Sequence, residues 1–441
     1  MNVCELDVPN HEANVIETQS VILNTEADES SRKNPITTGL ATMLSLVCSC
    51  SGTAVYSIPN AAASAGPISA ILAVLLMGLL FGWSCYRIVK HMEPKQNTLI
   101  DEIIIKKYPK YRTIIYIVSR VSSATIMLGA AIAIFLCAET AFFNTIFARF
   151  PALQKREYTA PICAAIVWML VLIDNPRVIV FLTSALSIGT LLNIIAVTLF
   201  CAQKTDSVEI SAYKTILKSN YGISNTFLGF ASFCGVLSMG FFVHNGASSI
   251  YSVLPNPRAA TVYVYGGYSI ISFIYIVISI VGVIPFASDV LNNKLPPSNY
   301  LNSFIDPTTL VTDGIYYSIA TFVYGVQSMA TLPLIYSVAR KTIFGNWKLL
   351  QQKRHIRYPV YLTLHTIIVI LSALVVILEI PLQIVLQVGG FAASIIWAAG
   401  MPLWYDIVHT KTGKRIAFSM IVNAVASVSL ILILTLQFLS F

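Results

Sequence analysis

The residues best suited to bind a small solute lie in two hydrophobic stretches that are each interrupted by glycine and polar side chains. The first interruption consists of small and hydroxyl-bearing residues: Ser51, Gly52, Thr53 and Ala54. The second combines glycine, aromatic and polar residues: Gly240, Phe241, Phe242, His244 and Asn245. Where a helix is interrupted, its freed N–H groups attract a carboxylate and its freed C=O groups attract an ammonium or another cation. The two stretches together therefore predict a binding site for a small zwitterion.

The composition indicates which elements must position these residues. Of the 441 residues, 56% are hydrophobic and only 11% are charged. Soluble domains carry about 25% charged residues, so the low charge excludes a soluble multidomain enzyme. A helix needs about 20 apolar residues to cross a bilayer. The sequence predicts eleven such helices, at residues 36–63, 67–89, 113–137, 160–174, 178–201, 225–251, 260–285, 312–337, 358–379, 381–405 and 416–439.

The basic residues orient the chain in the membrane. With a cytoplasmic N-terminus, the cytoplasmic segments hold 20 Lys and Arg residues and the opposite segments hold 7. This distribution follows the positive-inside rule. The odd number of helices places Phe441 on the extracellular or lumenal side. The predicted location is thus an integral, multi-pass position in either the plasma membrane or a vacuolar or lysosomal membrane.

Four segments follow from this topology. Residues 1–35 contain seven Asp and Glu residues and few large apolar ones, which predicts a disordered acidic cytoplasmic tail. Residues 36–205 form a first half with five helices, residues 206–405 a second half with five, and residues 406–441 a cytoplasmic loop with the eleventh helix. One interrupted helix opens each half, and an offset of five helices inverts the second half. Matching interruptions in two halves are typical of a transporter substrate site.

The polar residues of the predicted helices allow more than one interpretation. Small residues also permit close helix packing, which is the alternative explanation of the two interruptions. His244 is the strongest candidate for proton coupling, because histidine titrates near physiological pH and is rare inside membranes. Its alternative role is to hydrogen-bond carbonyls at the interruption. We interpret Arg120 as a gating or structural residue, His365 as a packing residue, and Glu139 and Glu379 as solvated residues near the outer helix ends.

Four stretches also carry a family resemblance. They are Ser51-Gly52-Thr53-Ala54 through Ser57-Ile58-Pro59-Asn60-Ala61 with Gly66, then Phe241-Phe242-Val243-His244 with Ile250-Tyr251 and Leu254-Pro255-Asn256-Pro257, then Thr331-Leu332-Pro333-Leu334, and finally Ile380-Pro381 with Val388-Gly389-Gly390 and Met401-Pro402-Leu403-Trp404-Tyr405. In their order and spacing they resemble the amino acid/auxin permease (AAAP) family. This is a branch of the amino acid–polyamine–organocation (APC) superfamily that includes vacuolar and neutral amino acid transporters.

The resemblance implies an all-α polytopic membrane protein of eleven helices. It further implies a LeuT-like 5+5 inverted repeat with broken helices 1 and 6, and alternating access around those two helices. Thr331 lies in the stretch that matches the eighth-helix element of the family, and we assign it, with His244 and Arg120, to coupling or gating.

Two departures from the family pattern bear on the coupling ion. The glycine pair of the first helix is represented by Gly52 and Ala54, and the asparagine of sodium-coupled members is absent where Cys48, Ser49 and Cys50 stand. A thiol is a poor sodium ligand compared with a side-chain carbonyl. We therefore predict H⁺ rather than Na⁺ as the coupling ion, with facilitated exchange as the alternative. Backbone carbonyls with Thr321, Ser328 or Thr331 keep a sodium site open.

The predicted function is secondary active transport of amino acids, with no cofactor and no metal site. The eight cysteines show no zinc spacing. The interrupted regions carry no acid at mid-membrane depth, which favours neutral amino acids. The expected partners are a small amino acid and membrane lipid, not nucleic acid. The alternative is an amino-acid sensor on the same scaffold that signals through residues 1–35 to a cytosolic partner. Neither paired intramembrane aspartates, a His-x-x-Glu-His motif nor a channel filter motif is present, which argues against an enzyme or a channel.

Overall fold

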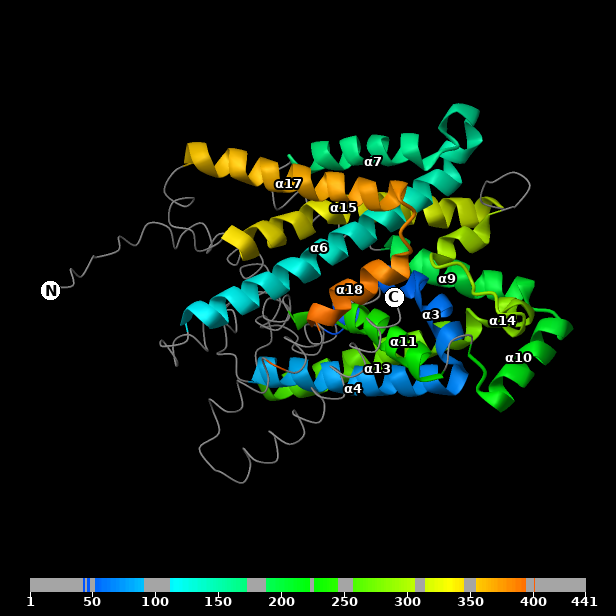
Figure 1. Cartoon of the computed structure of the whole chain (residues 1–441). Helices are drawn as coiled ribbons and strands as arrows, with labels where there is room; N and C mark the ends of the chain where they lie inside the picture. The colour runs from blue at the N-terminus through cyan, green and yellow to red at the C-terminus, as the bar shows by residue number, and fades with distance from the viewer. Residues whose placement is uncertain are drawn as a thin grey trace, which may run out of the picture.

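A computed structural model shows the protein as a bundle of helices (Figure 1). The structure describes residues 43, 46–47, 52–90, 112–172, 188–222, 226–244, 257–305, 314–344, 354–393 and 400. The acidic tail and the predicted eleventh helix lie outside these residues. Within them the elements are α-helices and short 3-10 helices, which confirms the all-α prediction.

The elements follow the predicted helices in order. The α-helices are α3 (Ile58–Ala65), α4 (Pro67–Lys90), α6 (Arg112–Thr145), α7 (Arg156–Val171), α9 (Ile188–Lys204), α10 (Ser207–Ser219), α11 (Thr226–Gly240), α13 (Pro257–Val281), α14 (Ala287–Leu291), α15 (Ile315–Phe344), α17 (Arg354–Ile377) and α18 (Leu382–Ala392). The 3-10 helices are η1 (Thr53–Tyr56), η3 (Phe147–Arg149), η4 (Pro151–Leu153), η5 (Ile284–Phe286) and η6 (Tyr300–Phe304).

Several helices are long and apolar enough to cross a membrane. Four such segments lie in the described residues, at Pro67–Arg87, Thr113–Arg149, Thr261–Leu291 and Arg357–Ile377. On α4, Leu72, Leu76 and Leu79 recur at helical spacing and are all exposed. An exposed apolar stripe on a long helix is the surface that a lipid environment requires. The protein is therefore an integral multi-pass membrane protein.

The helices of the two halves pack in matching pairs. In the first half, α3, α4, α6, α7 and α9 follow one another, and in the second half the corresponding helices are α11, α13, α15, α17 and α18. Contacts join α3 to α11, α4 to α13, α6 to α15 and α7 to α17. The contact of α9 with α15 has its counterpart in the contact of α18 with α6. This exchange of partners is the contact pattern of an internal repeat.

The two halves run in opposite directions. At one end of the bundle lies a group of elements that we call the cap, formed by α10, η5, α14 and η6 (Figure 1). Asn220, which ends α10, hydrogen-bonds to the first turn of α4, so the preceding helix α3 ends at the cap. The helix α11 follows α10 in the chain and so runs away from the cap. The helices α3 and α11, which belong to the predicted broken helices 1 and 6, are thus antiparallel, as a 5+5 inverted repeat requires.

The cap was not predicted from the sequence, because its helices are short and carry polar residues. Asp206 begins α10 by accepting hydrogen bonds from the N–H groups of Val208 and Glu209, at 2.9 and 2.8 Å. This is an ordinary aspartate N-cap. Glu209 in turn accepts a 2.8 Å hydrogen bond from the N–H of Ser288, at the start of α14. Local capping and one helix-to-helix bond therefore order segments that hydropathy alone leaves unassigned.

The environment of Glu139 corrects one expectation. We interpreted this residue as solvated, yet its side chain is completely buried between α6 and α7. The helix α6 continues to Thr145, eight residues beyond the predicted end, so Glu139 lies inside the helix. Glu379 is exposed and has a positive φ of 52°, in agreement with the expected solvated position. His365 is buried and stacks on Tyr336, which confirms its packing role.

Candidate functional site

The first interrupted helix has no α-helical turn between Gly52 and Ser57. Residues Thr53–Tyr56 form the 3-10 helix η1, in which the Ser57 N–H donates to the carbonyl of Ala54 at 3.0 Å. The helix α3 then starts at Ile58 with Pro59 as its second residue. Proline has no N–H, and this position needs none, so the sequence restarts the helix here. All four residues of η1 are buried in protein, where irregular backbone is tolerated within a membrane.

The second interrupted helix ends in the same manner. The helix α11 stops at Gly240, and Phe241 to Val243 are non-helical before His244. Ending the helix frees two buried carbonyls, and each accepts a hydrogen bond from a tyrosine hydroxyl of α13. Tyr275 donates to the carbonyl of Gly240 and Tyr268 donates to that of Phe241, both at 3.1 Å. The tyrosines are seven residues apart and so lie on one face of α13. They stabilise the interruption without restoring the helix.

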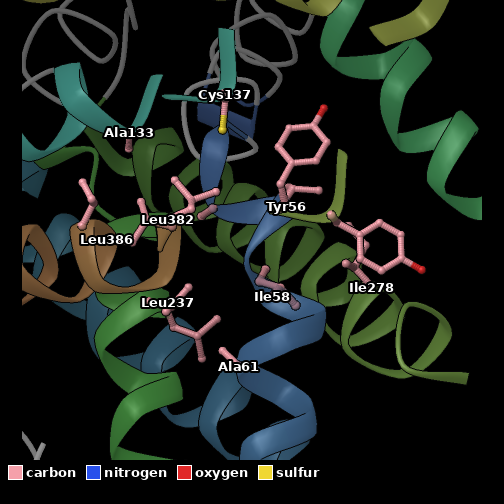
Figure 2. Packing of buried hydrophobic residues seen from close by; sticks show 14 of the residues in the cluster. Tyr56, Ile58, Ala61, Ala133, Cys137, Leu237, Ile278, Leu382 and Leu386 are labelled. Atoms are coloured by element: carbon pink, nitrogen blue, oxygen red, sulfur yellow. The ribbon is translucent and has the colours of Figure 1, made fainter. Parts of the chain in front are cut away.

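The two interruptions are in direct contact. A Cβ atom on Gly240 would lie 3.0 Å from the Cβ of Ala54 and 2.8 Å from the hydroxyl oxygen of Tyr275. The end of α11 therefore approaches η1 so closely that any larger residue at this position would force its neighbours to shift. Figure 2 shows Leu237 of α11 and Ile58 of α3, and these two helices are in contact. The N-terminal end of α3 and the C-terminal end of α11 thus meet at one place inside the bundle.

This arrangement brings opposite partial charges together. The N-terminus of a helix carries about half a positive charge and its C-terminus about half a negative charge. Here α3 begins at the interruption and α11 ends at it. The site therefore presents a positive and a negative backbone end a short distance apart, which matches the charge distribution of a zwitterion.

His244 lies on the α4 side of the second interruption. Its Nε2 is 3.0 Å from the hydroxyl of Ser84 on α4, and its ring stacks on Phe242 and meets Phe81 edge-on. Nδ1 is buried and makes no hydrogen bond within the described ranges. Phe241 is also completely buried, and its ring contacts Tyr268 and Tyr275. The histidine and this phenylalanine therefore hold the interruption against α4 and α13.

The helices α6 and α15 contribute residues that the sequence did not identify. The ring of Tyr56 in η1 lies 4.8 Å from the ring of Tyr324 on α15, and both are buried. The thiol of Cys137 on α6 is hydrogen-bonded to Tyr324. Figure 2 shows this cysteine pointing at the η1 ribbon, close to Tyr56. Only the pairing of α6 with α15 reveals these residues, because both helices look like uninterrupted apolar segments in the sequence.

The remaining predicted residues are not all in this region. Thr53 and Ala54 are buried in η1, and Gly52 is its first neighbour. Ser51 and Asn245 lie outside the described residues. Thr331 is half-buried on α15 and donates a 2.8 Å hydrogen bond to the carbonyl of Gln327. Arg120 is half-buried, with its guanidinium 5.0 Å from the ring of Tyr116. It precedes Cys137 by 17 residues of α6, about 25 Å along the helix, and so lies far from the interruptions.

Hydrogen bonds join η6 and the residues just before it to three helices of the bundle. Asn60 of α3 donates to the carbonyl of Pro296, and Asn144 of α6 donates to the Asn302 side chain at 3.2 Å. Cys201 of α9 lies 3.2 Å from the hydroxyl of Tyr300 in η6. The helices α3, α6 and α9 are thus all tied to residues 296–302. A small hollow remains beneath the cap, lined by Ala62, Ala63, Gly66, Pro67, Tyr213, Ile216, Tyr221, Ser279, Val283 and Val290.

The described part of the chain shows no group of three or more His, Cys, Asp and Glu side chains arranged to hold a metal ion. The described residues around the two interruptions supply backbone dipoles, hydroxyls and aromatic rings. Such groups bind and orient a solute.

Comparisons with known proteins gave structural but not sequence similarity. No protein-family model matches the chain, and no curated protein sequence is similar to it. Sixty chains in solved structures match its fold. One is MhsT in complex with L-phenylalanine, at 13% identity over 90% of this chain and 98% of that chain, with a TM-score of 0.48. Another is the manganese transporter of Eremococcus coleocola in complex with an aromatic bis-isothiourea compound, at 9% identity over 91% and 94%, with a TM-score of 0.45.

Proposed function

We propose that the protein is a secondary active transporter that moves amino acids across a membrane by alternating access. One observation carries the proposal: the interrupted ends of α3 and α11 meet inside a multi-pass bundle, with the N-terminus of one beside the C-terminus of the other. A substrate carboxylate would bind at the start of α3, and its ammonium at the end of α11. The residues that we assign to this contact are Thr53, Ala54, Gly240 and Phe241.

The two freed carbonyls, each already bonded to one tyrosine of α13, form the negative end of the site. Tyr268 and Tyr275 already occupy one direction at each freed carbonyl. A carbonyl oxygen has a second lone pair, so it can still accept one further hydrogen bond. An ammonium supplies the donors for that bond, whereas a neutral solute supplies fewer and a second carboxylate supplies none. The site therefore favours a zwitterion over an uncharged molecule or an anion.

The side-chain end of the substrate would face the aromatic and thiol groups of η1, α6 and α15. Tyr56, Cys137 and Tyr324 bring apolar surface and hydroxyls but no charge to this region. An uncharged pocket wall favours a neutral amino acid, as the sequence also suggests. The expected coupling ion is H⁺. In the predicted topology the cap faces outward.

Uptake by purified protein in proteoliposomes tests the proposal. A panel of labelled neutral, cationic and acidic amino acids would be offered with an imposed pH gradient, with a sodium gradient, and with neither. We expect neutral amino acids to accumulate under the pH gradient and a protonophore to abolish the accumulation. Protein that binds an amino acid but neither accumulates it nor exchanges it under any gradient would refute transport and favour the sensor.

A further inference from the structure

Glu139 forms a small polar cluster away from the helix interruptions. Its carboxylate is buried between α6 and the first turn of α7. The Arg156 guanidinium donates to one carboxylate oxygen at 3.3 Å, and the Thr159 hydroxyl donates to the other at 2.6 Å. The Arg156 side chain is 22% exposed, so the pair joins a water-accessible cation to a buried carboxylate. A buried carboxylate within a membrane-spanning helix is costly and marks a functional position.

The cluster can exist in two protonation states without leaving a buried charge unpaired. In the first state the Glu139 carboxylate is paired with Arg156. In the second state a proton neutralises Glu139, and the neutral group still accepts the Thr159 hydroxyl through its carbonyl oxygen. Arg156 then keeps water at its exposed edge and the ring of Phe143, which lies 5.5 Å from its guanidinium carbon. A purely structural ion pair needs no such second set of partners.

In the described part of the chain, the groups that interact electrostatically with the carboxylate lie on α7. On α7 they are Arg156 and Cys163, which both interact with it electrostatically. Glu157, in the same turn of α7, is exposed. Along α6 itself the nearest titratable group is Cys137, which lies on the opposite side of the helix because two residues turn it by about 200°. The titratable groups of α15 and α17 in the described residues include Tyr324 beside Cys137 and His365 against Tyr336.

The position of Cys137 connects the cluster to the substrate site. The helix α6 presents Glu139 to α7 and presents Cys137 to Tyr56 and Tyr324 (Figure 2). When the ion pair to α7 is lost, the outer part of α6 keeps the Thr159 hydrogen bond but loses its charged contact with that helix. Because Cys137 of α6 lies against Tyr56, a small change in the packing of α6 then alters the contacts of η1. The two faces of one helix turn thus link protonation at Glu139 to the first interruption.

We propose that Glu139 binds the proton that drives transport, with Arg156 as the cation that replaces this proton in the unloaded state. The inference rests on the proposed function. The proton comes from water at the cap end and binds to the Glu139 carboxylate, and the Glu139–Arg156 ion pair separates. The cluster gains one positive charge when the proton binds. Each proton-binding event therefore adds one positive charge to the protein.

The test compares Glu139→Gln with Glu157→Gln, an exposed glutamate of the adjacent turn. Glutamine keeps the size of Glu139 and an acceptor for Thr159 but cannot bind or release the proton. With one proton per substrate, a pH gradient of one unit sustains about tenfold accumulation. We expect the Glu157→Gln variant to retain this accumulation in proteoliposomes. We expect Glu139→Gln to exchange labelled for unlabelled substrate near the wild-type rate but to reach no accumulation.

The result that overturns the proposal is tenfold accumulation by Glu139→Gln. Loss of both exchange and accumulation by this variant, while it stays monodisperse in detergent, also overturns it. A second measurement does not need transport: infrared difference spectra of the wild type between mildly alkaline and mildly acidic pH. We expect a protonated-carboxyl band that moves to higher frequency in Thr159→Val, because a hydrogen bond to the acid carbonyl is removed. An absent or unmoved band contradicts the assignment even where Glu139→Gln fails to fold.

Failure of the proposed function itself has a different signature. If the wild type neither exchanges nor accumulates any amino acid of the panel, transport is refuted and the proton drives nothing. The infrared band then still reports whether Glu139 takes up a proton. Transport without a role for Glu139 instead gives accumulation in every variant.

Discussion

The replacement of Gly240 by alanine gives the most direct test of the contact between the two interruptions. The new Cβ would lie 2.8 Å from the hydroxyl oxygen of Tyr275 and 3.0 Å from the Cβ of Ala54. Ordinary contact begins near 3.4 Å, so the phenol oxygen would have to move by about 0.6 Å. The hydrogen bond from Tyr275 to the Gly240 carbonyl is already 3.1 Å long and would not survive that displacement.

The energetic cost of Gly240→Ala follows from these contacts. Overpacking a well-packed core costs about 1–3 kcal/mol. A buried carbonyl that loses its donor costs a further ~1–3 kcal/mol. These costs concern folding stability. Substrate binding loses about tenfold in affinity for each 1.4 kcal/mol needed to bring the Gly240 carbonyl back to its native position. We expect the variant to remain folded, because the displaced groups are few, but to bind and transport substrate at least tenfold more weakly.

The assay is substrate binding and initial uptake rate in proteoliposomes, with thermal unfolding in detergent as the measure of stability. The control is Phe227→Leu, an exposed position on the same helix α11. The double variant Gly240→Ala with Tyr275→Phe isolates the mechanism, because phenylalanine removes the oxygen that the new methyl group meets. The cost of Gly240→Ala should therefore be smaller in the Tyr275→Phe background. Wild-type affinity for Gly240→Ala would refute the close approach of η1 and α11. Equal costs in both backgrounds would refute the contact between the new methyl group and the Tyr275 hydroxyl.

Three further outcomes are expected. Gly66→Ala should lower the thermal unfolding temperature, because Gly66 has a φ of +86° and the added Cβ would lie 2.7 Å from the carbonyl oxygen of Asn220. An unchanged unfolding temperature would contradict the tight α3–α4 junction. Tyr324→Phe should change the ratio of uptake rates between a small and a large neutral amino acid more than threefold, because it removes side-chain hydrogen bonding worth about 1 kcal/mol from the pocket wall. An equal loss of uptake for both substrates would exclude a role in selectivity. His244→Ala should destabilise the protein, because it removes a buried stacked ring. Uptake by this variant should keep the pH profile of the wild type. A flattened profile would assign the coupling proton to this histidine instead of Glu139.

The hydropathy of the sequence determined the fold class and most helix positions. Long apolar segments have one stable solution in a bilayer, because every backbone polar group must be hydrogen-bonded internally. The interruptions were equally visible, since Gly52 and Pro59 in one segment and Gly240 in the other change the backbone itself. Such residues act on the backbone at their own positions, so the interruptions can be recognised from the sequence without the structure.

The partners of the interruptions depended on the tertiary structure. Tyr268 and Tyr275 look like ordinary residues of an apolar helix, and only the pairing of α13 with α11 brings their hydroxyls to the freed carbonyls. Glu139 shows the same dependence. Its position near the predicted outer end of the helix suggested a solvated side chain, whereas the placement of α7 along α6 buries it against Arg156 and Thr159. The environment of a polar side chain is decided by residues far away in the chain, and the sequence alone therefore specified where the backbone breaks but not what surrounds it.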